Sequence, residues 1–139
     1  MEKKRILMID DDKLPMQYYI RSLEKNNFEV KFFLRPDDAF EYLDNEQPHI
    51  DGVILDIMLP PGERYKGKQT NQGLRTGIFV LKDIREHPRY LSIPVVVLTN
   101  VRNPKTLAEF EEGDLLKIAF KPDYPPKKLV HLLEHMLNI

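Results

Sequence analysis

Residues 51–60 read DGVILDIMLP, and this stretch decides the fold. Val53, Ile54 and Leu55 form a continuous apolar run with β-branched residues, which indicates a strand that is buried on both faces. The run ends directly at an acid, Asp56. Because ligands of an open parallel sheet bind beyond the carboxyl ends of its strands, this stretch predicts a functional site as well as a strand.

Four similar apolar runs lie before and after this one, and longer segments with helical periodicity separate them. The expected strands cover residues 6–9, 28–34, 53–55, 93–98 and 115–120. The expected helices carry apolar stripes at Met16/Ile20/Leu23, Phe40/Leu43, Val80/Leu81/Ile84 and Leu129/Leu132/Leu133/Met136/Leu137, and a further helix is expected from Asn103-Pro104 to Gly113. This alternation predicts an α/β fold in which helices cover both faces of a five-stranded parallel sheet.

The composition is typical of one globular domain and excludes several classes of function. The chain has 139 residues, 42% of them hydrophobic, and it contains no cysteine, so disulfides and thiolate sites play no part. Its 21 basic and 22 acidic residues leave a net charge of −1, which argues against bulk electrostatic binding of nucleic acid or anionic lipid. The sequence has no signal peptide and no segment of membrane-spanning length, so we expect a cytoplasmic protein.

Polar side chains follow four of the five expected strands. They are Asp10, Asp11 and Asp12 after the first strand, Asp56 after the third, Thr99 after the fourth and Lys121 after the fifth. If the strand order is 2-1-3-4-5, the first and third strands are neighbours and their acids meet where the strand order reverses. Each signal alone has a plain structural explanation, such as a helix cap or a turn, but their coincidence points to a shared site.

The residue types at these strand ends suit phosphoryl transfer. Carboxylates without histidine or cysteine favour a hard cation such as Mg²⁺, which would also relieve the repulsion between them. A carboxylate is a possible nucleophile that forms an aspartyl phosphate. An ammonium group and a hydroxyl supply charge and a hydrogen bond to phosphoryl oxygens. These residues therefore predict a magnesium-dependent phosphoryl acceptor with Asp56 at its centre.

Four segments together resemble the receiver domains of bacterial response regulators, the family that includes the chemotaxis regulator. ILMIDDD (6–12) resembles the first strand with its acids, DGVILDIMLP (51–60) the phosphoacceptor strand, PVVVLTN (94–100) the hydroxyl-bearing strand and FKP (120–122) the lysine-proline ending. The resemblance covers essentially the whole chain. It implies a single receiver domain over residues 1–139, with a flavodoxin-like three-layer sandwich and the strand order 2-1-3-4-5.

The resemblance also assigns roles to the acids. Asp56 would accept a phosphoryl group from the phosphohistidine of a histidine kinase or of a phosphotransfer protein, or from a small phosphodonor. Asp11, Asp56 and the backbone carbonyl of Met58 would bind Mg²⁺ directly, and Asp10 would bind it directly or through water. Asp12 would cap the first helix rather than bind metal.

The other two strand ends would sense the phosphoryl group. Lys121 would contact a phosphoryl oxygen, and its peptide bond to Pro122 would be cis. Thr99 would move its hydroxyl onto the phosphoryl group and so change the surface that a downstream protein binds. The resemblance thus implies a signalling module rather than an enzyme in the ordinary sense. Its downstream protein partner is unknown, and no direct contact with nucleic acid or membrane is expected.

Three features depart from the pattern of the family. Ile118 stands three residues before Lys121, where many receivers carry an aromatic residue that moves on activation, and Asn100 stands where a small residue is usual. The segment 60–76 is a long polar insertion, directly followed by Gly77, which takes the place of the family's glycine before the third helix. Ile118 puts the aromatic form of the switch in doubt, whereas the bulk of Asn100 would narrow access to Asp56 and alter the rates of phosphorylation and dephosphorylation.

Alternatives remain for both the insertion and the function. The insertion is either a solvated, disordered surface loop or a binding loop that presents Arg64, Lys66, Lys68 and Arg75 to a partner. The main alternative function is a pseudo-receiver that binds a protein without being phosphorylated. An aspartyl-nucleophile hydrolase is disfavoured because Met58 stands where its second acid would be, and a flavin protein because no phosphate-binding loop follows the first strand.

Overall fold

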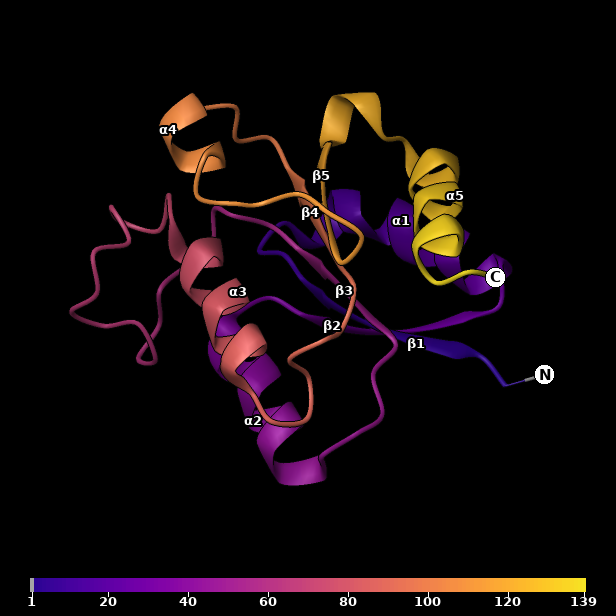
Figure 1. Ribbon diagram of the computed structural model, residues 1–139, viewed down its shortest axis with the longest axis horizontal. Helices are drawn as coiled ribbons and strands as arrows, with labels where there is room; N and C mark the ends of the chain where they lie inside the picture. Colours follow the sequence, from indigo (N-terminus) through magenta and orange to yellow (C-terminus); the bar gives the residue numbers. More distant parts are fainter. Residues whose placement is uncertain (1) are drawn as a thin grey trace.

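The computed structural model describes residues 2–139, which form one parallel sheet covered by helices (Figure 1). The sheet has five strands in the order β2-β1-β3-β4-β5, which confirms the predicted order. The strands are β1 (Lys4–Ile9), β2 (Phe28–Phe33), β3 (Gly52–Leu55), β4 (Val95–Thr99) and β5 (Leu116–Phe120). The five helices are α1 (Lys13–Lys25), α2 (Pro36–Glu46), α3 (Thr76–Glu86), α4 (Pro104–Leu107) and α5 (Pro126–Met136).

The helices form the outer two layers of a three-layer sandwich. Figure 1 shows α1 and α5 on one side of the sheet and α2 and α3 on the other. Each side has its own apolar core. β3 serves both cores, because Val53 and Leu55 pack among the residues of α2 and α3, whereas Ile54 packs among those of α1 and α5. The continuous apolar run of this strand therefore has a partner layer on each face.

The start of α3 lies very close to the end of β3. The amide of Gly77 donates a hydrogen bond of 2.8 Å to the carbonyl of Ile57. A Cβ atom on Gly77 would clash with the carbonyl oxygen of Asp56 and would lie 2.5 Å from the Cα of Ile57. Only glycine permits this approach, which brings the first turn of α3 against the backbone that carries Asp56.

The expected helix from Asn103 to Gly113 is wrong in its length, because α4 is a single turn. The predicted cap is confirmed, since the Asn103 side chain accepts hydrogen bonds from two amides of that turn. Beyond the turn, the chain pairs with β5 instead of continuing as a helix. Gly113 forms an antiparallel bridge with Leu116, and the Glu112 carboxylate accepts a 2.7 Å hydrogen bond from the amide of Ile118. These contacts pair backbone groups of β5, which lies at the edge of the sheet. A longer helix would leave those backbone groups without partners.

Within residues 2–139, no helix is long and apolar enough to cross a membrane. This agrees with the hydropathy of the sequence. The cytoplasmic location stays a prediction.

We predict that Gly77→Ala destabilises the protein by about 1–3 kcal/mol, because the added methyl group forces the start of α3 away from β3. The free energy of unfolding in urea measures this loss. Gly113→Ala is the matched control, since a Cβ atom there meets no atom within 4 Å. Equal stabilities for the two variants would show that the close approach of α3 does not contribute to folding.

Candidate functional site

Three carboxylates come together at the carboxyl edge of the sheet. β1 and β3 are neighbours with Ile9 paired to Leu55, so the next residues along the two strands, Asp10 and Asp56, lie side by side. The amide of Asp56 donates a 3.1 Å hydrogen bond to the carbonyl of Ile9 and fixes this register. Ligand oxygens of Asp10, Asp11 and Asp56 all lie within 4.8 Å of one another.

Lys121 reaches the same point from β5. Its Nζ lies 2.9 Å from Oδ2 of Asp10 and 3.0 Å from Oδ2 of Asp56, and it donates a hydrogen bond to Asp56. The Lys121 side chain is only 15% exposed, so the ion pairs are largely shielded from solvent. The structure therefore brings the lysine at the end of the fifth strand into contact with the acids at the ends of the first and third.

The turn after Lys121 differs from expectation in its peptide bond. Among the described residues no peptide bond is cis, so the expected cis bond to Pro122 is wrong here. The chain instead enters a 3₁₀ turn, η1 (Lys121–Asp123), in whose first positions a proline without an N–H is tolerated. The buried hydroxyl of Tyr19 holds this turn by donating a 2.8 Å hydrogen bond to the carbonyl of Tyr124. Tyr19 was not among the residues expected near the site, although it lies three residues after Met16 of the apolar stripe of α1.

The two oxygens of Asp56 have different partners. Oδ1 accepts the amide of Ile57 at 2.6 Å, whereas Oδ2 accepts the ammonium of Lys121. The side chain of Met58 is 44% exposed beside the site, and its backbone carbonyl stays a predicted metal ligand. These contacts leave lone pairs on Asp56 for a ligand, because a carboxylate has about four acceptor positions.

Asp10 rather than Asp12 organises the start of α1. Asp12 occupies the N-cap position, but its side chain makes no capping hydrogen bond, so its expected capping role is wrong. Instead, Oδ1 of Asp10 accepts the amide of Asp12 at 2.9 Å. The buried carboxylate thus binds the amide of the N-cap residue itself, while the amides of the first turn of α1 receive no hydrogen bond from the Asp12 side chain.

The acids outnumber the cation that faces them. Burial raises the pKa of Asp10 to about 6; the charge of Asp56 adds to this rise and Lys121 opposes it. Burial, and then Asp56, also raise the pKa of Asp11. Burial lowers the pKa of Lys121, but the charges of Asp56 and Asp10 outweigh burial and raise it overall. An all-oxygen cluster with excess negative charge fits a hard divalent cation such as Mg²⁺.

Thr99 lies at the same edge without contacting the acids. It is fully buried at the end of β4, and its Oγ1 accepts a 3.1 Å hydrogen bond from the amide of Val101. No hydrogen bond joins Thr99 to Asp56 among the described residues. Ile118, three residues before Lys121, packs partly buried against the core under α2 and α3.

The insertion is anchored at its base, which differs from the expectation of a disordered loop. Figure 1 shows residues 60–76 projecting beside α3. The Asp37 carboxylate, on α2, accepts the amides of Glu63 and Arg64 at 2.9 and 3.1 Å. Tyr65 is buried, and its hydroxyl donates a 2.8 Å hydrogen bond to Asp83 on α3. The base of the loop is therefore tied to both helices of that face.

Two of the four basic residues of the insertion, Arg64 and Arg75, form ion pairs with residues outside it, whereas Lys66 pairs only with Glu63 of the insertion itself, at 4.0 Å. Arg64 stacks over the Phe40 ring at 3.7 Å and forms a 3.1 Å ion pair with Asp83. Arg75 pairs with Glu109 in the segment after α4. Lys66 and Lys68 remain exposed at the tip. A partner that recognises the loop by charge would therefore contact these two lysines.

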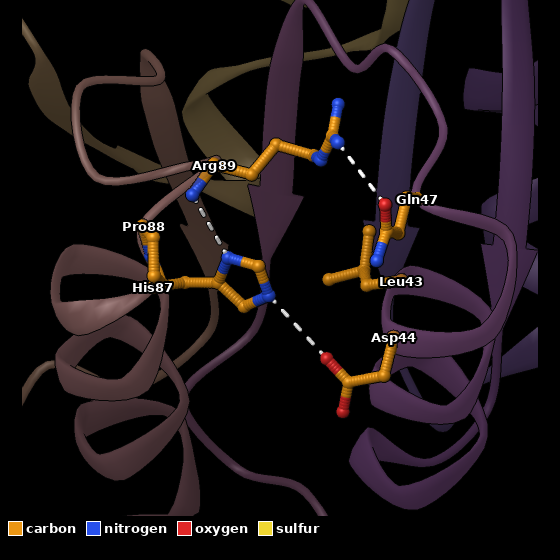
Figure 2. A pocket seen from close by; sticks show the side chains of 6 residues that line it. All are labelled: Leu43, Asp44, Gln47, His87, Pro88 and Arg89. Carbon is orange, nitrogen blue, oxygen red and sulfur yellow. Dashed lines mark hydrogen bonds and ion pairs between the residues drawn. The ribbon is translucent and has the colours of Figure 1, made fainter.

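A separate cavity of about 540 Å³ lies between α2 and α3 (Figure 2). It is lined by Leu43, Asp44, Gln47, His87, Pro88 and Arg89. His87 contacts Asp44 at 3.3 Å, and Arg89 donates to Gln47 at 3.1 Å across the opening. The cavity lies at the carboxyl ends of these helices, whereas the acids lie at the carboxyl edge of the sheet. It therefore belongs to the opposite end of the molecule and does not form part of the acidic site.

Comparison with known families and proteins agrees with this arrangement. The family model for the response regulator receiver domain matches residues 6–134. The signal receiver domain of an HD domain-containing protein from Pseudomonas fluorescens Pf-5 superposes with a TM-score of 0.76 at 22% identity. The match covers 99% of this chain and 89% of that one, and it shows a shared fold.

Two larger proteins contain a related segment. The 3′,5′-cyclic-nucleotide phosphodiesterase regA of Dictyostelium discoideum is 29% identical over 97 residues, which cover 70% of this chain and 11% of that protein. The CAI-1 autoinducer sensor kinase/phosphatase CqsS of Vibrio cholerae is 28% identical over 121 residues, which cover 86% of this chain and 16% of that protein. The chain thus spans less than a fifth of the length of each relative.

We predict that Asp10→Asn stabilises the metal-free protein at pH 7.5 by about 1–3 kcal/mol. Folding raises the pKa of Asp10 from 3.8 to about 6, so its ionised form destabilises the fold above pH 6, and this cost disappears below about pH 4. Urea unfolding with a chelator at pH 7.5 and pH 4 measures both effects. The exposed Asp12→Asn provides the control. A gain that persists at pH 4, or that Asp12→Asn reproduces, would contradict the burial of charge at Asp10.

We also predict that Asp37→Ala speeds tryptic cleavage after Lys66 and Lys68 by about tenfold or more. The variant removes the acceptor of two loop amides, and a hydrogen bond to a charged group is worth about 1.5–3 kcal/mol. A time course of intact mass follows the cleavage. Asp38→Ala is the control, because that carboxylate pairs with Arg35 on its own helix end. Wild-type cleavage rates in both variants would show that Asp37 does not hold the loop.

Proposed function

The chain belongs to the response regulator receiver family, and on this premise we propose that Asp56 accepts a phosphoryl group. The donor would be the phosphohistidine of a histidine kinase or of a phosphotransfer protein. One observation carries the proposal: Lys121 contacts both Asp10 and Asp56, within a cluster of three carboxylates at the carboxyl edge of the sheet. Nucleophile, cation ligands and phosphate-binding ammonium are thus within reach of a single phosphoryl group.

The transfer exchanges one bond to phosphorus for another. A free lone pair of the Asp56 carboxylate attacks the phosphorus atom, and the phosphorus–nitrogen bond of the donor breaks. Its electron pair stays on the donor imidazole, whose other nitrogen already carries a proton. The amide of Ile57 holds Oδ1 of Asp56 during the attack. Lys121, drawn toward the acids, meets the charge of the phosphoryl oxygens.

Mg²⁺ would be held by the carboxylates of Asp10, Asp11 and Asp56 and by the backbone carbonyl of Met58. When bound, the ion neutralises the carboxylates and the phosphoryl oxygens and so lowers the repulsion between nucleophile and donor. The raised pKa of Asp10 supports this assignment, because it reflects a buried carboxylate that lacks enough positive charge nearby.

Phosphorylation would then change the surface that a partner protein binds. The modified Asp56 carries additional negative charge and new acceptor oxygens. The Thr99 hydroxyl, whose hydrogen bond among the described residues is with the amide of Val101, would turn toward these oxygens. We treat residues 1–139 as one receiver domain with the insertion at 60–76. We expect a cytoplasmic protein that interacts with a histidine kinase or phosphotransfer protein and with a downstream protein, and we do not expect direct contact with nucleic acid or membrane.

Incubation with Mg²⁺ and acetyl phosphate tests the proposal directly. We predict an increase in intact mass of one phosphoryl group, which is absent in Asp56→Asn and without Mg²⁺. Lys121→Met should label at least about tenfold more slowly, since one preorganised charge at a developing anion is typically worth that much or more. Binding of beryllofluoride without labelling would indicate a poor donor. A wild-type protein that neither takes the phosphoryl label nor binds beryllofluoride would support the pseudo-receiver function instead.

A further inference from the structure

Arg102 joins the two strand ends that carry Thr99 and Lys121. Its guanidinium lies 4.2 Å from the centre of the Phe120 ring, and one of its nitrogens lies 3.4 Å from Oδ2 of Asp123. Phe120 directly precedes Lys121, and Asp123 lies in the turn that follows it. Arg102 itself belongs to the segment between β4 and α4, three residues after Thr99. The side chain thus connects this segment to the Lys121 turn.

The Lys121 turn is held firmly on one side and weakly on the other. On the α1 side, the hydroxyl of Tyr19, which is 8% exposed, donates a 2.8 Å hydrogen bond to the carbonyl of Tyr124. On the other side, the side chains of Arg102 and Asp123 are 55% and 58% exposed. Exposed ion pairs and exposed cation–π contacts are both weak. The contact with Arg102 can therefore open without disturbing the core.

The Arg102 segment also determines where the Thr99 hydroxyl is held. Oγ1 of Thr99 accepts the amide of Val101, the residue directly before Arg102. Asn103, directly after Arg102, caps α4 with its side chain. Between the buried Thr99 and this cap there are only three residues, so a constraint on Arg102 limits the movement of the Val101 amide. The Thr99 hydroxyl and the Arg102 side chain are therefore coupled through a short stretch of backbone.

We propose that Arg102 is a positioning residue, a latch that holds the segment between β4 and α4 against the Lys121 turn in the unmodified protein. The inference rests on the proposed function of Asp56. A phosphoryl group on Asp56 draws the Thr99 hydroxyl toward its oxygens, and the Val101 amide and Arg102 have to yield for this movement. The latch stabilises only the unmodified arrangement and so slows phosphoryl acceptance.

The rate of labelling by acetyl phosphate tests the latch. Arg102→Gln, which keeps a polar side chain but removes its charge and its guanidinium, should label about fivefold faster, the size expected when two weak exposed contacts are lost. Lys105→Gln is the matched control, because it makes the same charge change in α4, where the ammonium forms no ion pair with any described residue. An unchanged or slower rate in Arg102→Gln, or an equal increase in Lys105→Gln, would overturn the proposal.

A double variant distinguishes a latch from a general charge effect. Asp123→Asn removes only the ion pair and should give a smaller increase than Arg102→Gln. The combined variant should label no faster than Arg102→Gln alone, because both changes break the same contact. If the increases in labelling rate of the two single variants multiply in the combined variant, the two residues do not act through one contact, and the proposal is overturned. The free energy of unfolding in urea should fall by no more than about 1 kcal/mol, which is the fivefold change in rate converted to free energy, and a larger loss of stability would indicate a merely structural role.

Hydrogen exchange of the Val101 amide provides a readout that does not need phosphorylation. In the unmodified protein we expect about fivefold faster exchange in Arg102→Gln than in wild type or Lys105→Gln, since the amide is released more often. An unchanged exchange rate of the Val101 amide in Arg102→Gln would overturn the latch, whatever the labelling rate of that variant. If the wild-type protein takes no label and binds no beryllofluoride, the proposed function of Asp56 fails, and the exchange of the Val101 amide then decides alone whether the latch exists.

Discussion

The ammonium of Lys121 lies between two buried carboxylates, and the remaining features of the site depend on this contact. Nζ is 2.9 Å from Asp10 and 3.0 Å from Asp56, yet one positive charge does not balance the cluster that includes Asp11. Burial, and then the charge of Asp56, raise the pKa of Asp10 even though Lys121 opposes them. A site with unbalanced negative charge gains from a divalent cation, and the cation in turn allows a phosphoryl group, itself an anion, to approach a carboxylate nucleophile.

The fold holds the acceptor more firmly than it holds the elements that would sense phosphorylation. Asp56 lies between the paired ends of β1 and β3 and against the first turn of α3, where Gly77 permits backbone contact. Thr99, in contrast, contacts a short segment whose outer tie is the exposed side chain of Arg102. Rigid packing favours the geometry that transfer requires, whereas weak exposed contacts favour a change of conformation at small cost in free energy. Ile118 stands where many receivers carry an aromatic residue that moves on activation. The contact that we propose to open here is instead the stack of Arg102 on Phe120.

The insertion combines a fixed base with an exposed basic tip. Asp37 and Asp83 tie its backbone and the Tyr65 side chain to two helices, so the loop is ordered before any partner binds. An ordered loop loses less conformational entropy on binding than a flexible one. Lys66 and Lys68 extend from this base without contributing to it. Among the four basic residues of the insertion, these two are therefore the ones that can be replaced to test partner recognition without disturbing the fold.

The sequence by itself determined the strands and the set of polar strand ends, and its resemblance to receiver domains implied the order of the strands. Apolar runs that end at Asp10, Asp56, Thr99 and Lys121 are local patterns, and a parallel sheet brings such ends to one edge whatever the details of its loops. The cap at Asn103 was equally readable, because it depends on backbone groups within one turn.

Only the tertiary structure decided the length of α4, the anchoring of the insertion and the contacts of Tyr19 and Arg102. The length of α4 depends on a contact outside any helical pattern, between Glu112 and the edge strand β5. The other features depend on atoms farther apart in the chain, such as the Asp37 carboxylate with residues 63 and 64 and the guanidinium of Arg102 with the Phe120 ring. Local propensity does not contain these long-range contacts. For the same reason the sequence was enough to propose Asp56 as the acceptor, whereas the structure was needed to find the contact that would restrain its switch.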